Sequence, residues 1–358
     1  DKEFVAIINS NKKLEKNFHD HLIFKITNNK ILIELLKIVP ISDITIEKFL
    51  RFLRAKILLN ISIIKNKEYA LKIIEAIATQ CFINEYIYPF TQKEETQLRE
   101  IEKIIIHNLK VNKINECALE ISCLASYRPL NSYKWSSKIK DFDEIKNLFR
   151  QQIREPNEEL LLRKKLESKK IINEVSLKVK HQYENNPYPR WEKIALLSNS
   201  QNPEKFFRSI RINCKYDQMK NWNNINVLVA GCGTGQHAIT TATKYKNSFV
   251  TAIDLSISSL GYAKRKANEL NIKNLDFLQM DILDLKKFKQ KFHIIECVGV
   301  LHHMKDPFKG WKILCDLLNE HGLMMIGLYS KHAREHISET RKEIQSLYSK
   351  INIDNIKN

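Results

Sequence analysis

The stretch "INVLVAGCGTGQH", residues Ile225 to His237, decides how the second half of the chain is interpreted. Its first six residues form a continuous apolar run, which is typical of a strand buried in a parallel sheet. The glycines that follow let the backbone turn tightly and approach a ligand closely. The stretch therefore predicts a strand, a ligand-binding loop and a helix over His237 to Tyr245, in that order.

Downstream of this stretch, short apolar runs alternate with helical patterns. Four further strands are expected in "FVTAIDL", "LDFLQMD", "FHIIECVGVL" and "GLMMIGLY". Helices are expected between them in "SSLGYAKRKANEL" and "DPFKGWKILCDLL", where apolar residues recur at helical spacing. This alternation predicts an α/β fold whose open parallel sheet carries helices on both faces.

The glycine loop and two aspartates indicate the kind of ligand. Asp254 ends the second expected strand, about 20 residues beyond the loop, where a carboxylate can accept hydrogen bonds from ribose hydroxyls. A dinucleotide site favours a third glycine at position 236, which is Gln236 here. Asp281 ends the third expected strand and can accept from an adenine amino group. These residues favour S-adenosylmethionine over a dinucleotide.

Four motifs resemble those of class I S-adenosylmethionine-dependent methyltransferases. "VLVAGCGTGQH", "AIDLS", "MDI" and "GVLHHMKDP" come in that family's order and spacing, between Asn226 and Tyr329. The resemblance implies a Rossmann-like sheet with the donor bound along the strand ends. It implies that glycines line the methionine part, Asp254 the ribose, and Asp281 with its neighbour the adenine. The expected cofactor residues of this core are Gly231, Cys232, Gly233, Gly235, Asp254, Leu255, Asp281, Ile282 and Val298.

The segment "HQYENNPYPRW", residues 181–191, holds two prolines and three aromatic residues, and the prolines favour a stiff, extended backbone. A similar segment joins the helical N-terminal region to the catalytic domain in a group of bacterial methyltransferases. That resemblance implies a lid over the donor, formed by Tyr183, Tyr188, Arg190 and Trp191. Alternatively, Tyr188 and Trp191 only pack a helix onto the sheet.

The same layout resembles bacterial protein-lysine methyltransferases that modify outer-membrane proteins. It implies a protein lysine as methyl acceptor and a helical region that dimerises or binds substrate. A small-molecule methyltransferase acting on a quinone or lipid precursor is the alternative enzyme. An inactive remnant that binds only the donor, or a partner chain, is the non-enzyme alternative.

Three residues are candidates for catalysis. His302 and His303 lie where a base can reach an acceptor, although such histidines can also only organise the turn that follows. Glu296 is a charged residue in a buried strand, so it needs either a partner or a role in the acceptor pocket. No His, Cys or Asp cluster has the spacing of a metal site, so no metal is expected.

The first half of the chain has a different character. Stretches such as "FLRFLRAKILLNISII", residues 49–64, place apolar residues three and four apart, which predicts helices throughout residues 1–150. Residues 151–195 are expected to form one connecting helix, "NEELLLRKKLESKKIINEVSLKVKHQY", and the lid arm. Residues 196–358 are the expected methyltransferase domain.

Composition limits the remaining possibilities. The net charge of +18 reflects lysines spread along the whole chain without a long basic run, so no nucleic-acid partner is expected. No apolar run is long enough to span a membrane, and the seven cysteines never form a CxxC pair, so a reducing cytoplasmic location is expected. Because only five strands are found, where such sheets usually have seven, a C-terminal truncation is expected.

Overall fold

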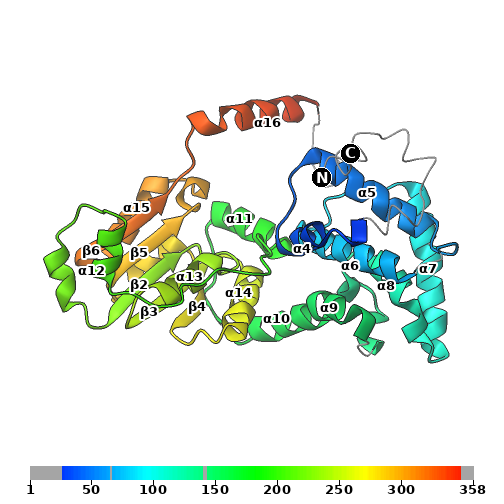
Figure 1. Ribbon diagram of the computed structural model, residues 1–358. Helices are drawn as coiled ribbons and strands as arrows, with labels where there is room; N and C mark the ends of the chain where they lie inside the picture. Colours follow the sequence, from blue (N-terminus) through cyan, green and yellow to red (C-terminus); the bar gives the residue numbers. More distant parts are fainter. Residues whose placement is uncertain (1–25, 65–66, 140–142, 348–358) are drawn as a thin grey trace. The chain divides into compact units, whose positions relative to one another are not determined.

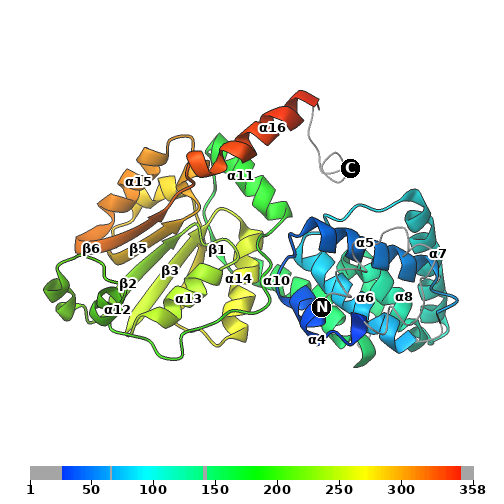
Figure 2. The same cartoon turned by 45° about the horizontal axis from the view of Figure 1, so that its top comes forward.

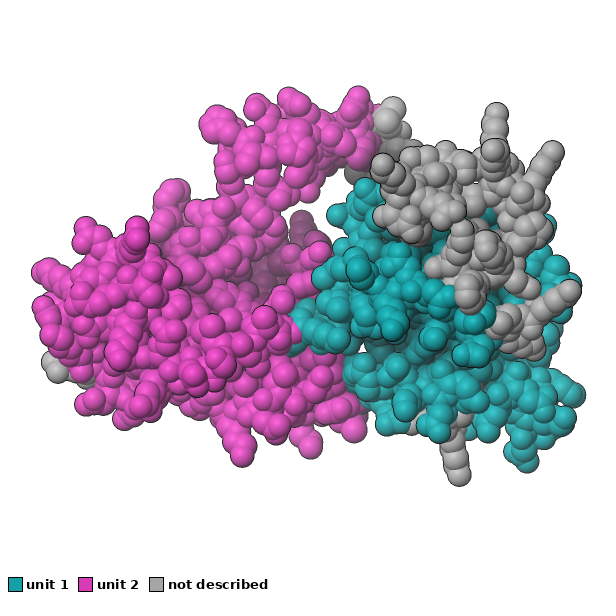
Figure 3. All heavy atoms as spheres, viewed as in Figure 1, with its two compact units in different colours: residues 1–157, 191–193, 351–358 teal, residues 158–190, 194–350 magenta. Residues whose placement is uncertain are grey.

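The computed structural model describes residues 26–64, 67–139 and 143–347. These residues divide into two compact units (Figure 3). The first lies within residues 1–157 and includes residues 191–193, whereas the second comprises residues 158–190 and 194–350. The tail "INIDNIKN" lies outside the described residues. Each unit has its own architecture and is considered separately.

The regular elements described in the first unit are helices, which confirms the expected helical N-terminal region. The helices are α4 (Lys30–Ile38), α5 (Ile44–Leu59), α6 (Lys67–Ile83), α7 (Gln92–Lys110), α8 (Ala118–Ala125), α9 (Lys146–Phe149) and the start of α10 (Glu155–Arg163). Leu53 and Ile57 of α5 are fully buried, as their helical spacing predicts. Buried Arg54 donates hydrogen bonds from its two terminal guanidinium nitrogens to the carbonyls of Ser126 and Pro89, which partly offsets the cost of this charge in the core.

The second unit contains a parallel sheet, as the sequence predicts (Figures 1 and 2). Its strands are β1 (Glu167–Ser168), β2 (Ile225–Ala230), β3 (Ser248–Asp254), β4 (Leu275–Gln279), β5 (Phe292–Val298) and β6 (Leu318–Gly327). They lie in the order β1-β4-β3-β2-β5-β6, and every pairing is parallel. Successive strands are therefore added on one side of β2 first and then on its other side. At such a point, α/β sheets open a ligand-binding crevice at the carboxyl ends of their strands.

Helices cover both faces of this sheet. Leu228 and Ala230 of β2 share a buried cluster with Leu314 of α15 (Pro307–Asp316), which places α15 on one face. Helices α13 (Gln236–Lys244) and α14 (Ile257–Glu269) contact β3 and β4 from the other face. The remaining helices of the unit are α11 (Glu174–Asn185), α12 (Pro203–Ser209) and α16 (Glu335–Leu347).

The connecting segment differs from the prediction of one continuous helix. Helix α10 ends at Arg163, and the chain then runs extended through β1, which adds a sixth strand beside β4. The amide of Lys169 donates to the carbonyl of Gln279 at 3.0 Å, so the extended segment that contains β1 forms backbone hydrogen bonds with the edge of β4. A new helix, α11, then starts at Glu174, and the side chain of Asn173 caps it. The single-helix prediction was therefore wrong.

Candidate active site

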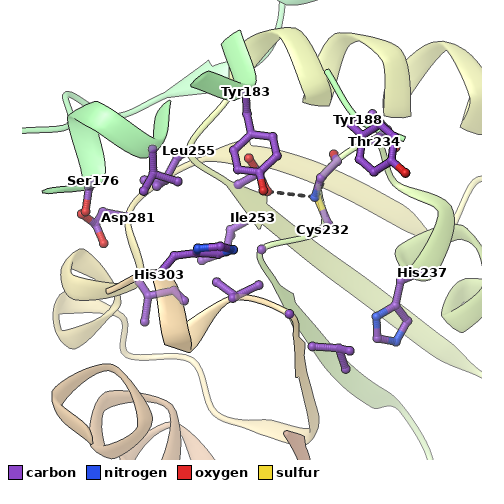
Figure 4. Close-up of a pocket in the computed structure, with 18 of the residues that line it drawn as sticks. Ser176, Tyr183, Tyr188, Cys232, Thr234, His237, Ile253, Leu255, Asp281 and His303 are labelled. Carbon is purple, nitrogen blue, oxygen red and sulfur yellow. Dashed lines mark hydrogen bonds between the residues drawn. The ribbon is translucent and has the colours of Figure 1, made fainter. Parts of the chain in front are cut away.

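A cavity of about 360 Å³ lies at the carboxyl ends of β2, β3, β4 and β5 (Figure 4). Its floor is formed by the loops that follow these strands, and its cover comes from α11 and the Tyr188–Pro189 arm. This volume lies in the range of small-molecule sites. The cavity unites three sequence motifs that are far apart in the chain.

Two glycines of the loop after β2 are required by their surroundings. Gly231 has φ +76°, and a Cβ there would lie 2.2 Å from Val300 Cγ2. Gly235 has φ +84° at the N-cap of α13, and a Cβ there would lie 2.5 Å from Ala263 Cβ. Gly231 lines the cavity together with Cys232 and Gly233, whereas Gly235 lies outside it. Gly235 thus allows close packing of α13 and α14, not contact with a ligand.

Asp254 lines the cavity at the end of β3. Its Oδ2 accepts from the amide of Gly233 at 2.8 Å, and its Oδ1 accepts from the amide of Ser256 at 2.9 Å. Burial raises the pKa of this carboxyl, and the backbone N–H donors only partly offset that effect. Each oxygen keeps a further lone pair, which suits a pair of ligand hydroxyls. Leu255 continues the same wall.

Asp281 is 4% exposed and lines another part of the cavity. Its Oδ1 accepts from the amide of Leu283 at 2.9 Å, which fixes the side chain. The adjacent side chains of Met280 and Ile282 are apolar and also line the cavity. A carboxylate between apolar walls suits a flat ring that carries an amino group. Val298 lines the cavity from the end of β5.

The cover consists of two short pieces of chain. Ser176, Val179 and Tyr183 of α11 line the cavity. Glu184 holds the end of α11 to the start of α14, because it accepts from the hydroxyl of Ser258 at 3.0 Å. The Tyr188–Pro189 arm is held to the glycine loop by Thr234, whose hydroxyl donates to the Pro189 carbonyl at 2.7 Å.

Arg190 and Trp191 are not among the residues that line the cavity. The chain leaves the cavity after Pro189, and Trp191 is a buried residue of the first unit. The structure thus brings Tyr183 and Tyr188 of the expected lid to the cavity, but not the two residues that follow.

Glu296 lies on β5, and its side chain does not line the cavity. It is 2% exposed and accepts from Lys244 Nζ at 2.9 Å, from His237 Nε2 at 2.8 Å and from the hydroxyl of Thr241. Burial alone would raise the pKa of this carboxyl, but the donors outweigh burial and lower it to about 2. Glu296 is therefore an ionised residue with several partners.

The two candidate histidines are placed differently. His303 lines the cavity, whereas His302 stacks on Tyr329 with ring centroids 3.8 Å apart and does not line it. Burial lowers the pKa of both imidazoles, assisted by the positive charge of Arg334. A neutral imidazole is the form that can accept a proton.

The sequence analysis missed several residues that line the cavity. His237 is the most informative, since it lines the cavity while its Nε2 contacts Glu296. Its position, two residues beyond Gly235 in "GTGQH", was the available signal, because the first turn of a helix after such a loop faces the ligand. Met280, Gly299, Val300 and Met304 were also missed.

The structure also bears on metal binding and on membrane crossing, within the residues that it describes. Among those residues, no group of three or more His, Cys, Asp or Glu side chains is arranged to hold a metal ion. None of the described helices combines the length and the apolar character that crossing a membrane requires.

Known proteins resemble the second half of the chain. The family model described as "Methyltransferase domain" matches residues 222–357. An uncharacterized protein of Synechococcus sp. is 32% identical over 122 residues, which are 34% of this chain and 29% of that protein. The ubiquinone biosynthesis O-methyltransferase of Coxiella burnetii is 29% identical over 112 residues, covering 31% of this chain and 47% of that protein.

Two more relatives extend this set. The (S)-coclaurine N-methyltransferase of Thalictrum flavum is 32% identical over 97 residues, covering 27% of this chain and 26% of that protein. Among solved structures, PKMT2 from Rickettsia typhi aligns with a TM-score of 0.35 at 21% identity, covering 43% of this chain and 31% of that chain. The chain thus spans less than half the length of each of these relatives.

Proposed function

We propose that this chain, whose residues 222–357 belong to the class I S-adenosylmethionine-dependent methyltransferases, transfers methyl groups to lysine side chains of a protein. The cofactor, S-adenosylmethionine, supplies a methyl group carried by a positively charged sulfur.

The observation that carries the choice of methyl donor is the charge of the cavity wall. Asp254 and Asp281 line it, and the described residues that line it include no lysine or arginine. A site for a dinucleotide needs donors or positive charge for its phosphates, whereas a cationic nucleoside needs carboxylates and apolar walls. The residues present therefore fit S-adenosylmethionine, with Asp254 at the ribose and Asp281 beside the adenine.

The cover of the cavity supports a nitrogen acceptor that becomes cationic. Tyr183 lines the cavity, and its pKa is raised by burial and by the nearby Tyr329 and Asp254. The faces of tyrosine rings attract ammonium groups, so the rings of Tyr183 and Tyr188, which both line the cavity, can hold a lysine side chain or its methylated product. The (S)-coclaurine N-methyltransferase relative acts on nitrogen, as its name states. The helical N-terminal region agrees with the resemblance to bacterial protein-lysine methyltransferases.

Transfer needs a neutral amine in line with the methyl group, so the residues mainly position and desolvate it. The apolar side chains of Val179 and Met304 line the cavity and exclude water, which lowers the pKa of an incoming amine. His303 is the lining residue placed to accept the proton that this amine releases. The amine then forms the new C–N bond while the C–S bond of the donor breaks.

The test is an array of lysine-containing peptides incubated with methyl-labelled S-adenosylmethionine and the chain. Each peptide has a partner in which arginine replaces lysine, and Asp254→Ala serves as the enzyme control. We expect label on lysine peptides only, with a mass increase of one methyl group or more. Label that persists in the arginine partners would overturn the lysine assignment.

A second acceptor class rests on a separate observation. The relative from Coxiella burnetii is named an O-methyltransferase of ubiquinone biosynthesis, so a small phenol is a candidate acceptor. A catechol such as caffeic acid is the probe. Label on the catechol, together with unlabelled peptides, would replace the protein acceptor by a small molecule.

The first unit has a proposed role of its own, which is to dimerise the chain or to bind the protein substrate. Its described residues form a separate helical core, as the fold of such a module requires. Light scattering of the purified chain tests dimerisation, and a monomer at micromolar concentration would leave substrate binding as the remaining role.

A further inference from the structure

We propose that Arg334, which rests on the ring of Tyr329 beside the opening of the cavity, binds an acidic side chain of the substrate close to the lysine that is methylated. This inference rests on the proposed function, because it takes a protein lysine as the methyl acceptor. It adds a property of the substrate, which is a negative charge near the target lysine.

The opening of the cavity lies at His303. This residue lines the cavity and is also exposed to solvent, so the cavity meets solvent there. Tyr329 lies nearby, because its ring centroid is 6.3 Å from that of His303. It is also close to the lining residue Tyr183, whose pKa is raised first by burial and then by Tyr329. A substrate that inserts a lysine at this opening must place the neighbouring residues over Tyr329 and its contacts.

Arg334 is held at this place by stacked rings. Its guanidinium carbon lies 3.9 Å from the centroid of the Tyr329 ring. His302 stacks on the same ring with centroids 3.8 Å apart, and neither of its ring nitrogens has a hydrogen-bond partner among the described residues. The contact of His302 is therefore one of packing, which fixes the tyrosine. A guanidinium that rests on an aromatic face keeps N–H groups for a carboxylate.

The charge of Arg334 is not compensated within the part of the chain that the structure describes. Its side chain contacts Tyr329, and no carboxylate among the described residues pairs with its guanidinium. Burial lowers the pKa of His302 and of His303, and the positive charge of Arg334 lowers both further, with no carboxylate to oppose it. An arginine is always charged. The surface around the opening is therefore positive and suits an anionic group.

The cavity behind this surface has the opposite charge. Asp254 and Asp281 line it, and the described lining residues include no lysine or arginine. The cationic donor and the target lysine therefore fit the interior, whereas an acidic neighbour of that lysine fits Arg334. Arginine and a carboxylate can form two parallel hydrogen bonds, which adds specificity. The net charge of +18 also favours the approach of an acidic protein segment.

The test uses pairs of peptides that contain a single lysine and differ only in the residues beside it, which are glutamate in one peptide and glutamine in the other. Fluorescence anisotropy measures the Kd of each peptide for the full chain in the presence of S-adenosylhomocysteine. We expect the glutamate peptide to bind about fivefold more tightly, because an ion pair at a partly exposed site contributes modestly. High salt should reduce this ratio, because it screens exposed charges.

Three variants of Arg334 and one control show where the preference arises. Arg334→Gln should abolish the preference for glutamate, and Arg334→Glu should reverse it. Arg334→Lys should retain part of it, since the charge stays but the planar fork is lost. Arg341→Gln, which removes an exposed arginine of α16, is the matched control and should keep the full ratio. A merely structural role of Arg334 would weaken both peptides together and leave their ratio unchanged.

The outcomes separate the inference from the proposed function. Equal affinity of the two peptides for the unaltered chain would overturn the inference, and so would a preference that Arg334→Gln retains. If the preference depends on Arg334 but methyl-labelled donor places no label on lysine, the lysine assignment fails while the anion site stands.

A small acceptor is compared in the same way, with caffeic acid and its amide. A preference for the acid that depends on Arg334, without any preference among the peptides, would overturn the protein origin of the anionic group. Label on lysine in both peptides at equal rates, together with equal affinities, would leave the lysine assignment standing and refute the role of Arg334.

Discussion

Asp254, at the end of β3, and Glu296, within β5, are two carboxylates of one sheet with opposite surroundings. Asp254 faces the cavity and receives hydrogen bonds from backbone amides of Gly233 and Ser256. Glu296 is enclosed and receives them from the side chains of His237, Lys244 and Thr241. Burial raises the pKa of the first carboxyl, whereas cationic and hydroxyl donors lower that of the second to about 2.

This difference separates two uses of a buried charge. The Glu296 carboxylate is compensated within the protein, so it stabilises the fold and positions α13. The Asp254 carboxylate is only partly compensated, so it is available to a ligand at some cost in stability. The comparison predicts that removing Glu296 mainly harms folding, whereas removing Asp254 mainly harms donor binding.

The largest expected effect is on folding. Glu296→Ala leaves Lys244 without its carboxylate in a largely buried position, since the lysine side chain is 13% exposed. Breaking such a buried pair costs about 3–5 kcal/mol of unfolding free energy. Urea denaturation measures the loss. Glu320→Ala, which removes an exposed glutamate, is the control and should change stability by less than about 1 kcal/mol. A loss of unfolding free energy below about 1 kcal/mol in Glu296→Ala would contradict the claim that Glu296 stabilises the fold.

Acid should remove the contribution of Glu296 to the free energy of unfolding. Its pKa falls from the ordinary 4.5 to about 2 on folding, so its stabilisation is fully present above pH 4.5. It is lost as the pH falls from there toward 2, because the unfolded chain takes up the proton first. Stability of the unaltered chain should therefore fall by roughly 3 kcal/mol more than that of Glu296→Gln over this window. Parallel acid profiles for the two proteins would contradict the assignment.

Asp254→Ala should weaken donor binding by about 10- to 100-fold, because a hydrogen-bonded charged group contributes about 1.5–3 kcal/mol. Folding stability should change by less than about 1 kcal/mol, since the removed charge was only partly compensated. Calorimetry with S-adenosylmethionine and urea denaturation measure the two quantities. Asp276→Ala, an exposed aspartate on neighbouring β4, should alter neither. Equal affinity of Asp254→Ala and the unaltered chain would place the ribose elsewhere.

The smallest expected effect concerns α11, which covers part of the cavity. Glu184 accepts from the hydroxyls of Ser256 and Ser258 at 3.1 and 3.0 Å, at the start of α14. Glu184→Gln weakens this attachment of α11, so we expect donor affinity to fall about threefold and proteolysis of α11 to accelerate. Glu174→Gln, at the exposed start of α11, is the control. Equal cleavage rates in both variants would show that Glu184 does not hold the cover.

Local sequence patterns predicted the sheet and the floor of the cavity. The apolar run at Ile225, the glycines that follow and the carboxylates that end β3 and β4 are properties of short segments. Because parallel strands align their carboxyl ends, Asp254 and Asp281 had to meet at one edge. The place of Tyr183 beside them was also anticipated, although it depended on a resemblance and not on spacing.

The cover of the cavity and the contacts of Glu296 were decided by tertiary structure. The single connecting helix was wrong because the edge of β4 pairs with Glu167 and Ser168, which no local pattern in residues 157–183 reveals. The sequence alone left open whether Glu296 has a partner or a place in the acceptor pocket.

The sequence by itself determined a parallel sheet with two aspartates at the ends of its strands, because strands, tight turns and the residues that end them are set by neighbours along the chain. Only the tertiary structure decided that His237, Thr241 and Lys244 surround Glu296, and that Glu184 holds α11 to α14. Such side-chain contacts join residues more than fifty positions apart. Their geometry depends on how helices pack on the sheet, and sequence spacing carries no record of that packing.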